Sequence, residues 1–150
     1  MTAGAWIAVA AVVLALGFGL WRAATDGRFR GTHRVRRAAR PVSTGAAGSV
    51  LAGTPWEPQL GERATLLQFS SAFCAPCRAT RRVLADVASS MPGVVHVEVD
   101  AEQHLDVVRR LGVLRTPTTL VLDAAGTEVT RAAGAPRTEQ VLVAVAKATG

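Results

Sequence analysis

The hydrophobic and polar positions of this chain follow two alternating periods over its C-terminal part. Residues 64–69 and 94–99 are short, mostly apolar runs rich in β-branched side chains, which is typical of buried strands. Between them, apolar side chains recur every three or four positions over 80–91, as on one face of a helix, and the Pro-Gly pair at 92–93 ends that helix. This region is therefore expected to fold as strand, helix and strand.

A second helix and a third strand are predicted next, the helix from a capping box and an apolar stripe. Asp100, with Gln103 three residues later, has the spacing of a capping box at the start of a helix. The apolar stripe of this helix is expected to consist of Leu105, Val108 and Leu111. Residues 118–122 form a third apolar strand.

A hairpin and a final helix complete the pattern. Residues 123–126 end in Gly126, at the turn position that favours positive φ, so residues 128–132 are expected to return as an antiparallel strand. Apolar positions over 141–148 line a closing helix. The order β-α-β-α-β-β-α predicts an α/β fold, with parallel strands joined by right-handed crossovers and an antiparallel hairpin at one edge.

The sequence contains two cysteines, Cys74 and Cys77, which lie between the strand at 64–69 and the helix that follows. Thiols at this spacing can close a small disulfide ring when the first lies just before a helix, whose N-terminus then stabilises its thiolate. The alternative is half of a structural zinc site, which usually needs four ligands. No second cysteine pair is present and the three histidines are scattered, so the pattern favours redox chemistry and predicts no metal.

With these features the chain resembles the thioredoxin family over about residues 60–150. The resemblance rests on Phe73-Cys74-Ala75-Pro76-Cys77-Arg78 and on Arg115-Thr116-Pro117-Thr118 at the start of the third strand. It implies a thioredoxin-like fold and a thiol–disulfide oxidoreductase that needs no cofactor. It also implies that Pro117 follows a cis peptide bond and faces the active-site disulfide, and that the backbone around Thr116 holds an extended substrate strand.

The resemblance also implies a role for each residue of the motif. Cys74, the more exposed thiol, attacks a substrate disulfide as a thiolate; Cys77 then attacks Cys74, releases the reduced substrate and leaves the Cys74–Cys77 disulfide. Pro76 fixes the backbone at the helix start, where its missing N–H costs little, and Phe73 supports the site from beside Cys74. The expected partners are disulfide-containing client proteins and a thiol electron donor, such as a thioredoxin reductase or a membrane thiol carrier.

Two positions and one segment depart from the family pattern. Gln68 stands where thioredoxins carry a buried aspartate that is thought to aid proton transfer at the second cysteine. A glutamine cannot act as a base, so water or another group does this or turnover through Cys77 is slower. Phe73 replaces a tryptophan and has no N–H donor. Two prolines within 50–58 argue against a regular helix there and predict an irregular element with Trp56 packed on the core.

Other polar residues near the motif are interpreted mainly as structural. His96 stands where the family has a lysine, and ordinary contacts at a strand end are favoured over catalysis. His104 is expected to be a solvated helix residue. The remaining candidates are the cations of the following helix, Arg78, Arg81 and Arg82. They could lower the pKa of Cys74 or attract acidic clients, but a solvated face is the simpler interpretation.

The N-terminal residues 1–21 carry no charged side chain. A helix over 3–21 would be roughly 28 Å long, close to the bilayer core of about 30 Å. Trp6 and Trp21 lie near its two ends, where interfacial aromatic residues are common. The segment 1–21 is therefore expected to be a single transmembrane anchor, in preference to a buried core helix or a cleaved signal peptide, which would need a basic start.

The positive charge is concentrated directly after this segment. Residues 22–40 contain seven arginines and one acid, or 7 − 1 = +6, which equals the net charge of the whole chain. By the positive-inside rule this basic juxtamembrane segment stays in the cytoplasm, which predicts a single-pass membrane protein with a cytoplasmic catalytic domain. Aromatic residues do not interleave the arginines beyond Phe29, so nucleic-acid binding is not expected. Small and polar residues over 41–59 predict a flexible or irregular linker to the thioredoxin-like domain at 60–150.

The leading hypothesis is a membrane-tethered thiol–disulfide oxidoreductase that reduces protein disulfides. One alternative is the same chemistry on the extracytoplasmic side, as in disulfide reductases of the cytochrome c maturation type. Another is a non-catalytic module that uses the thioredoxin fold for binding, with the cysteines idle or holding a metal.

Overall fold

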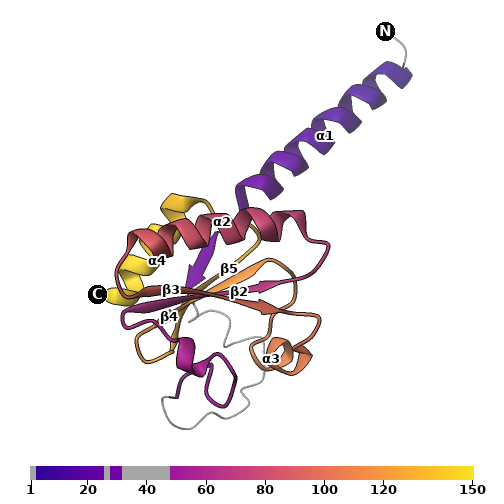
Figure 1. Cartoon of the computed structure of the whole chain (residues 1–150). Coiled ribbons are helices and arrows are strands. Elements are labelled where there is room, and N and C mark those ends of the chain that lie inside the picture. The colour runs from indigo at the N-terminus through magenta and orange to yellow at the C-terminus, as the bar shows by residue number, and fades with distance from the viewer. Residues whose placement is uncertain (1–2, 26–27, 32–47) are drawn as a thin grey trace.

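The computed structural model describes residues 3–25, 28–31 and 48–150. Its elements are α1 (Ala3–Thr25), β1 (Phe29–Gly31), the 3₁₀ helix η2 (Glu57–Gln59), β2 (Ala64–Ser70), α2 (Ala75–Ser90), β3 (Val94–Asp100), α3 (Leu105–Arg110), β4 (Thr118–Asp123), β5 (Glu128–Ala133) and α4 (Thr138–Thr149). From β2 onward the predicted order β-α-β-α-β-β-α is confirmed (Figure 1).

The strands form one sheet in the order β1-β5-β4-β2-β3. β2 pairs in parallel with β3, and β5 pairs antiparallel with β4, both as predicted. The expectation that β4 also runs parallel is wrong, because β4 pairs antiparallel with β2. The six residues of α3 span about 9 Å, too little to return along the seven residues of β3, which span about 23 Å. β4 therefore starts at the end of the sheet where β3 stops.

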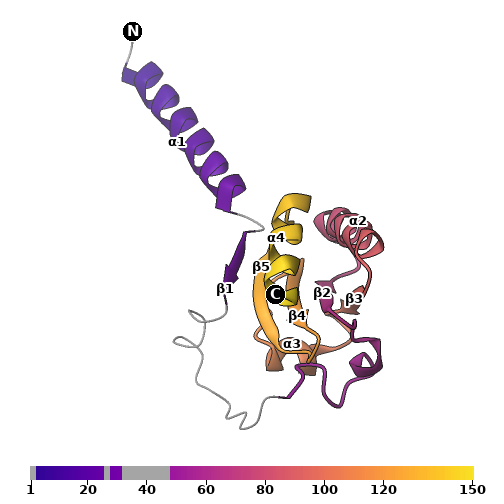
Figure 2. The ribbon, with the colours of Figure 1, turned by 90° about the vertical axis from the view of Figure 1, so that its left-hand side faces the viewer.

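Helices cover both faces of the sheet (Figures 1 and 2). α2 and α4 lie side by side on one face, and α3 lies on the other. All seven residues of β2 are buried, because both faces of this central strand are covered. The core under α2 and α4 contains Leu66, Leu84, Val87, Val121, Val141 and Val145; the core on the opposite face contains Leu51, Leu67, Phe69, Val97, Leu120 and Leu122.

The helix α3 begins later than its predicted cap. Asp100 accepts hydrogen bonds from the backbone N–H of Glu102 and from Gln103 Nε2, both at 2.8 Å, so its carboxylate closes a turn and caps no helix. The later start at Leu105 also changes the face that packs. Leu105 is half exposed and Val107 is buried, so the predicted apolar stripe is wrong at Leu105.

The segment before β2 is irregular, as predicted, and packs against the domain. It contains turns and the short helix η2, and Leu51 within it is fully buried. The predicted packing of Trp56 on the core is confirmed. Its ring meets the ring of His104 edge-on, with centroids 4.7 Å apart, so His104 contacts another side chain and is not simply solvated.

The N-terminal elements lie at the far edge of the sheet. β1 pairs antiparallel with β5, with Phe29 opposite Ala132, and Phe29 packs on the core under α4. α1 extends away from the sheet, and its large apolar side chains are exposed (Figure 1). In the part of the chain that the structure describes, no helix has both the length and the apolarity to cross a membrane, so the predicted transmembrane anchor is not confirmed. Most of the predicted basic segment and the start of the linker, residues 32–47, lie outside the described residues.

Candidate redox site

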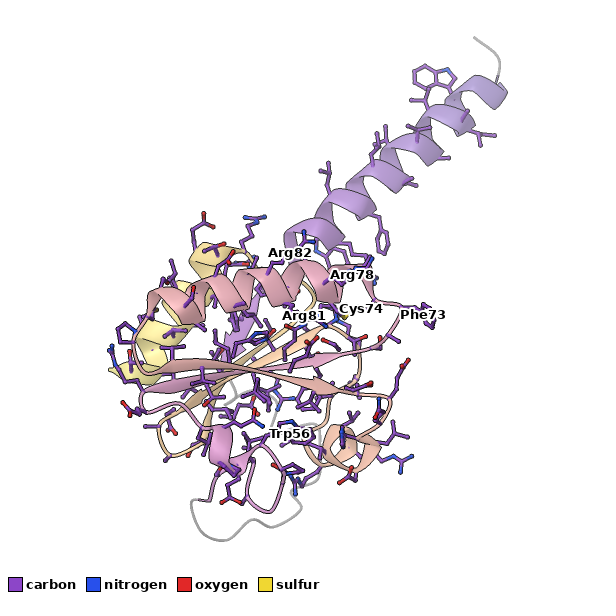
Figure 3. All side chains as sticks on the ribbon, viewed as in Figure 1. Trp56, Phe73, Cys74, Arg78, Arg81 and Arg82 are labelled. Carbon is purple, nitrogen blue, oxygen red and sulfur yellow. A yellow bond between two sulfur atoms is a disulfide. The ribbon has the colours of Figure 1, made fainter. Side chains whose placement is uncertain are left out.

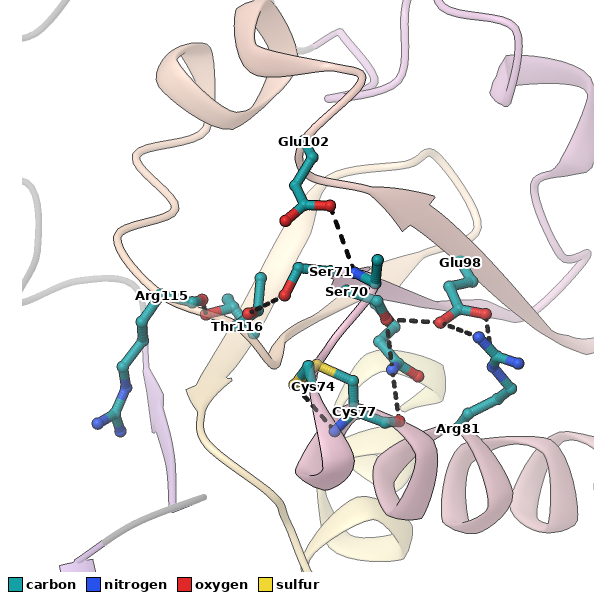
Figure 4. The surroundings of a disulfide bond; sticks show 12 residues. Ser70, Ser71, Cys74, Cys77, Arg81, Glu98, Glu102, Arg115 and Thr116 are labelled. Atoms are coloured by element: carbon teal, nitrogen blue, oxygen red, sulfur yellow. Dashed lines mark hydrogen bonds and ion pairs between the residues drawn. A yellow bond between two sulfur atoms is a disulfide. The ribbon is translucent and has the colours of Figure 1, made fainter.

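The two cysteines form a disulfide at the N-terminus of α2 (Figure 4). The S–S distance is 1.98 Å and the Cα–Cα distance is 5.2 Å. Cys74 is the N-cap residue, and its Sγ accepts a hydrogen bond from the backbone N–H of Cys77 at 3.1 Å. Cys77 lies in the first turn and is 2% exposed, whereas Cys74 is partly exposed. The structure thus presents one sulfur to solvent and buries the other beneath it.

The local sequence explains why the helix starts here. The first N–H groups of a helix have no partner within the helix, and a side chain at the N-cap usually supplies an acceptor. Here the Sγ of Cys74 is that acceptor, and Pro76 occupies the first turn, where no N–H is needed. A thiolate at this position gains from the positive end of the helix dipole. Beyond Cys74, Phe73 points away from the domain and is 99% exposed (Figure 3).

The loop before β4 faces this disulfide end of the sheet. The peptide bond between Thr116 and Pro117 is cis, and the Pro117 carbonyl accepts a hydrogen bond from the backbone N–H of Gly134 at 2.7 Å. The hydroxyl oxygens of Thr116 and Ser71 lie 3.0 Å apart, which links this loop to the turn that carries Cys74. The two motifs singled out in the sequence therefore meet at one end of the sheet.

Gln68 lies beneath Cys77 and is completely buried. Its Nε2 donates to the Cys77 carbonyl at 3.0 Å and to Ser70 Oγ at 2.8 Å, and its Oε1 accepts from His96 Nε2 at 3.1 Å. An amide side chain that makes these three contacts fixes the backbone of Cys77 without carrying charge. His96 is thus joined to the site through Gln68.

A charged pair continues this network toward solvent. Ser70 Oγ donates to Glu98 Oε1 at 2.5 Å, and the Arg81 guanidinium donates to the same oxygen at 2.8 Å, while its Nε lies 2.6 Å from Oε2 (Figure 4). Burial alone would raise the pKa of Glu98. Hydrogen bonds from Arg81 and Ser70, with the charges of Arg81 and His96, hold that pKa below its ordinary value.

The pKa of His96 is also lowered. Burial is the main cause, the charge of Arg81 acts in the same direction, and the charge of Glu98 opposes both. The imidazole is therefore neutral at pH 7, and the Nε2 that faces Gln68 Oε1 carries its proton. Glu98 is consequently the ionised member of this network, balanced by Arg81.

An open cavity of about 330 Å³ adjoins the disulfide. Its walls include Cys74, Cys77, Ser70, Ser71, Arg78 and Glu98. Across residues 3–25, 28–31 and 48–150, no group of three or more His, Cys, Asp or Glu side chains is placed to hold a metal ion. The arrangement places a disulfide, two carboxylates and hydroxyl groups around one solvent-accessible space, which suits thiol–disulfide exchange.

Ser70, Ser71 and Glu98 were not among the residues predicted from the sequence. The strand period places positions 68 and 70 on one face of β2, and 96 and 98 on one face of β3. Only the register of the β2–β3 pair, with Gln68 opposite Glu98, brings the two sets together. This register joins residues about thirty positions apart and cannot be read from local periodicity.

Comparison with known proteins gives one family. A family model described as Thioredoxin matches residues 49–148. Thioredoxin H-type 1 of Nicotiana tabacum is 33% identical over 78 residues, which cover 52% of this chain and 61% of that protein. Thioredoxin H2-2 of Oryza sativa subsp. japonica is 30% identical over 90 residues, with 56% and 66% covered. The matched parts thus cover between three fifths and two thirds of the length of these two relatives.

Solved structures share the fold at lower identity. The crystal structure of thioredoxin NaTrxh from Nicotiana alata superposes with a TM-score of 0.57 and 21% identity, covering 72% of this chain and 100% of that one. Thioredoxin F from spinach chloroplast gives a TM-score of 0.56 and 21% identity, with 64% and 88% covered. At these identities the likeness shows the fold alone.

Proposed function

Because the chain belongs to the thioredoxin family, whose model matches residues 49–148, we propose that it is a thiol–disulfide oxidoreductase that reduces protein disulfides. The single observation that carries this proposal is the Cys74–Cys77 disulfide at the N-terminus of α2, with one sulfur partly exposed and the other buried. The cis peptide bond before Pro117, at the same end of the sheet, supports it.

The reaction proceeds by two thiol exchanges. In the dithiol state, the Cys74 thiolate attacks one sulfur of a client disulfide, and the other client sulfur leaves as a thiolate that takes up a proton. The Cys77 sulfur then attacks Cys74 Sγ, the mixed disulfide breaks, and the second client sulfur leaves. The client gains two electrons and two protons, and the enzyme is left with the Cys74–Cys77 bond. A thiol donor, such as a thioredoxin reductase or a membrane thiol carrier, restores the dithiol.

The backbone around Thr116 and the ring of Phe73 form the proposed client-binding side. Thr116 is held by its hydroxyl contact with Ser71, so the loop stands at a fixed position beside Cys74. Phe73 is almost fully exposed and offers an apolar surface to a bound segment. A client that presents an extended, partly apolar segment beside its disulfide fits this side of the molecule.

Membrane attachment through α1 and a cytoplasmic position of the domain are further parts of the proposal. The exposed apolar side chains of α1, from Trp6 to Trp21, would leave water on entering lipid, which supports attachment. The arginines that follow α1 in the sequence support the cytoplasmic side. The extracytoplasmic side, with chemistry of the cytochrome c maturation type, is the alternative. A cysteine appended after Gly150 in the Cys74→Ser/Cys77→Ser chain distinguishes them, since an impermeant maleimide labels it in intact cells only on the outer side.

Reduction of insulin disulfides in the presence of dithiothreitol tests the proposed activity. Cys74→Ser should abolish it, and Cys77→Ser should trap a mixed disulfide with the client that mass spectrometry detects. Ser89→Ala, an exposed position on α2, is the matched control and should retain full activity. Activity that survives Cys74→Ser would show that the nucleophile is wrong. A wild-type chain that is inactive but binds one metal ion per chain would favour the non-catalytic alternative.

A further inference from the structure

The resolving step of the proposed reaction needs a proton acceptor near Cys77. The thiolate and not the thiol is the nucleophile, and an ordinary thiol titrates near pH 8.5, so it is only slightly ionised at pH 7. Cys77 is buried, and the side chain directly beneath it belongs to Gln68, which has no basic group. Water in the adjoining cavity or another residue at the site must therefore receive this proton.

Two carboxylates, Glu98 and Asp100, line the cavity that Cys77 also lines. Asp100 is engaged in the turn before α3, where it accepts two hydrogen bonds. Glu98 is directed into the site, because Ser70 Oγ donates to it and Ser70 is in turn bonded to the same Gln68 amide that holds the Cys77 carbonyl. Glu98 is thus the carboxylate that the network ties to the backbone of Cys77, and it lines the same cavity as Cys77.

We propose that Glu98 accepts the proton of Cys77 in the resolving step, and that Ser70, Gln68 and Arg81 are positioning residues for it. This inference rests on the proposed oxidoreductase function. The S–H bond of Cys77 breaks as its proton passes to a Glu98 carboxylate oxygen, and the S–S bond to Cys74 forms. The bond between Cys74 and the client sulfur breaks with its electron pair on the client sulfur. That thiolate then takes the proton from Glu98, which restores the carboxylate.

The charged and polar groups around Glu98 determine the basicity of its carboxylate. Arg81 from α2 faces it as a cation, while His96 from β3 is neutral at pH 7, and Ser70 and Gln68 from β2 do not titrate. Arg81 keeps Glu98 ionised and so ready to accept a proton, but it also makes the carboxylate a weak base. General base catalysis contributes roughly 10²–10⁴-fold and grows with basicity, so we expect about 10²-fold from Glu98.

Reaction of the reduced full-length chain with 5,5′-dithiobis(2-nitrobenzoate) separates the two exchanges in one stopped-flow trace. The first 2-nitro-5-thiobenzoate released reports attack by Cys74, and the second reports resolution by Cys77. Glu98→Gln should slow the second phase about 10²-fold at pH 7 and leave the first nearly unchanged. Glu139→Gln, an exposed acid in the first turn of α4, is the matched control and should change neither phase. Absence of both phases in the wild type would refute the oxidoreductase proposal itself.

The pH profile of the second phase distinguishes proton transfer from a structural role. In the wild type the rate should fall only as Glu98 becomes protonated. In Glu98→Gln the rate of the second phase should rise tenfold with each pH unit until the Cys77 thiol ionises. Arg81→Met removes the main group that lowers the pKa of Glu98, so the low-pH limb of the second-phase rate should move to higher pH, with the rate at pH 7 equal to or above that of the wild type. The proposal would be overturned if the pH profile of the second-phase rate kept its wild-type shape in both variants. It would also be overturned if Glu98→Gln left the second-phase rate unchanged. If Glu98→Gln does not fold, the Arg81→Met profile still decides.

Discussion

Truncation of Leu51 to alanine measures whether the irregular segment before β2 is part of the folded core. Leu51 precedes the first central strand by thirteen positions in the sequence, yet its side chain is 0% exposed. It packs in the cluster that contains Leu67, Phe69 and Leu120. The backbone around it is held by a bond from Thr54 N–H to the Leu51 carbonyl at 2.9 Å. The segment should therefore not move to fill the cavity that truncation of Leu51 leaves.

The size of the effect follows from this complete burial. A Leu→Ala change in a core removes three carbon atoms from an apolar environment and leaves a cavity, and such changes lower the free energy of unfolding by about 2–5 kcal/mol. We expect about 3 kcal/mol for Leu51→Ala. For a domain of this size each 1 kcal/mol shifts the midpoint of thermal unfolding by roughly 4–8 °C, so the shift should be roughly 15 °C.

Urea unfolding of the oxidised full-length chain, followed by far-ultraviolet circular dichroism in one mild detergent, gives both free energies. Leu114→Ala is the matched control, because Leu114 is 95% exposed and its truncation should change stability by no more than about 0.5 kcal/mol. If Leu51→Ala and Leu114→Ala unfold within about 0.5 kcal/mol of each other, the packing assigned to Leu51 is wrong.

Three further changes test other parts of the structure. Because the pKa of His96 is lower in the folded chain than its unfolded value of 6.5, the unfolded state binds the proton first on acidification. The free energy of unfolding, measured by urea titration, should fall as the pH drops below 6.5. In His96→Gln it should fall less over the same pH range. In Gly61→Ala the new Cβ would lie 2.3 Å from the Ala64 carbonyl oxygen, so thermal melts should show a loss of about 3 kcal/mol. The loss should be smaller for Gly53→Ala, where the new Cβ would meet no atom beyond the neighbouring residues within 4 Å and only the positive φ of 71° opposes alanine. Phe73→Ala should leave stability within about 0.5 kcal/mol but raise the KM for a protein client, measured by insulin reduction.

Local sequence pattern was sufficient to predict the elements from β2 onward and the position of the disulfide. The period-2 runs, the helical stripe after Cys77 and the glycine at 126 are properties of neighbouring residues, and Gly126 has the expected positive φ of 76°. The start of α3 could not be predicted, since the side chain of Asp100 can either cap a helix or close a turn. Both are local options for the same residue, and tertiary packing decides between them.

Long-range pairing accounts for the remaining differences. The direction of β4 depends on how far α3 can carry the chain. The role assigned to Glu98 depends on the register between β2 and β3, which places it opposite Gln68. The pairing of Phe29 with Ala132 joins parts of the chain about one hundred residues apart. None of these features can be predicted from a short stretch of neighbouring residues.

The β1–β5 pairing limits the distance between the end of α1 and the redox centre. β1 starts opposite the end of β5 that neighbours Pro117, so the chain leaves α1 at the disulfide end of the sheet. β1 pairs with β5 in the sheet that carries the disulfide, so the reach from α1 to the redox centre is set by the residues before β1. Only residues 26–28 separate α1 from β1, a contour of roughly 14 Å when fully extended. Under the proposed membrane attachment, a client held at the same membrane would therefore meet Cys74 at a high effective concentration, and a distant client only by diffusing to it.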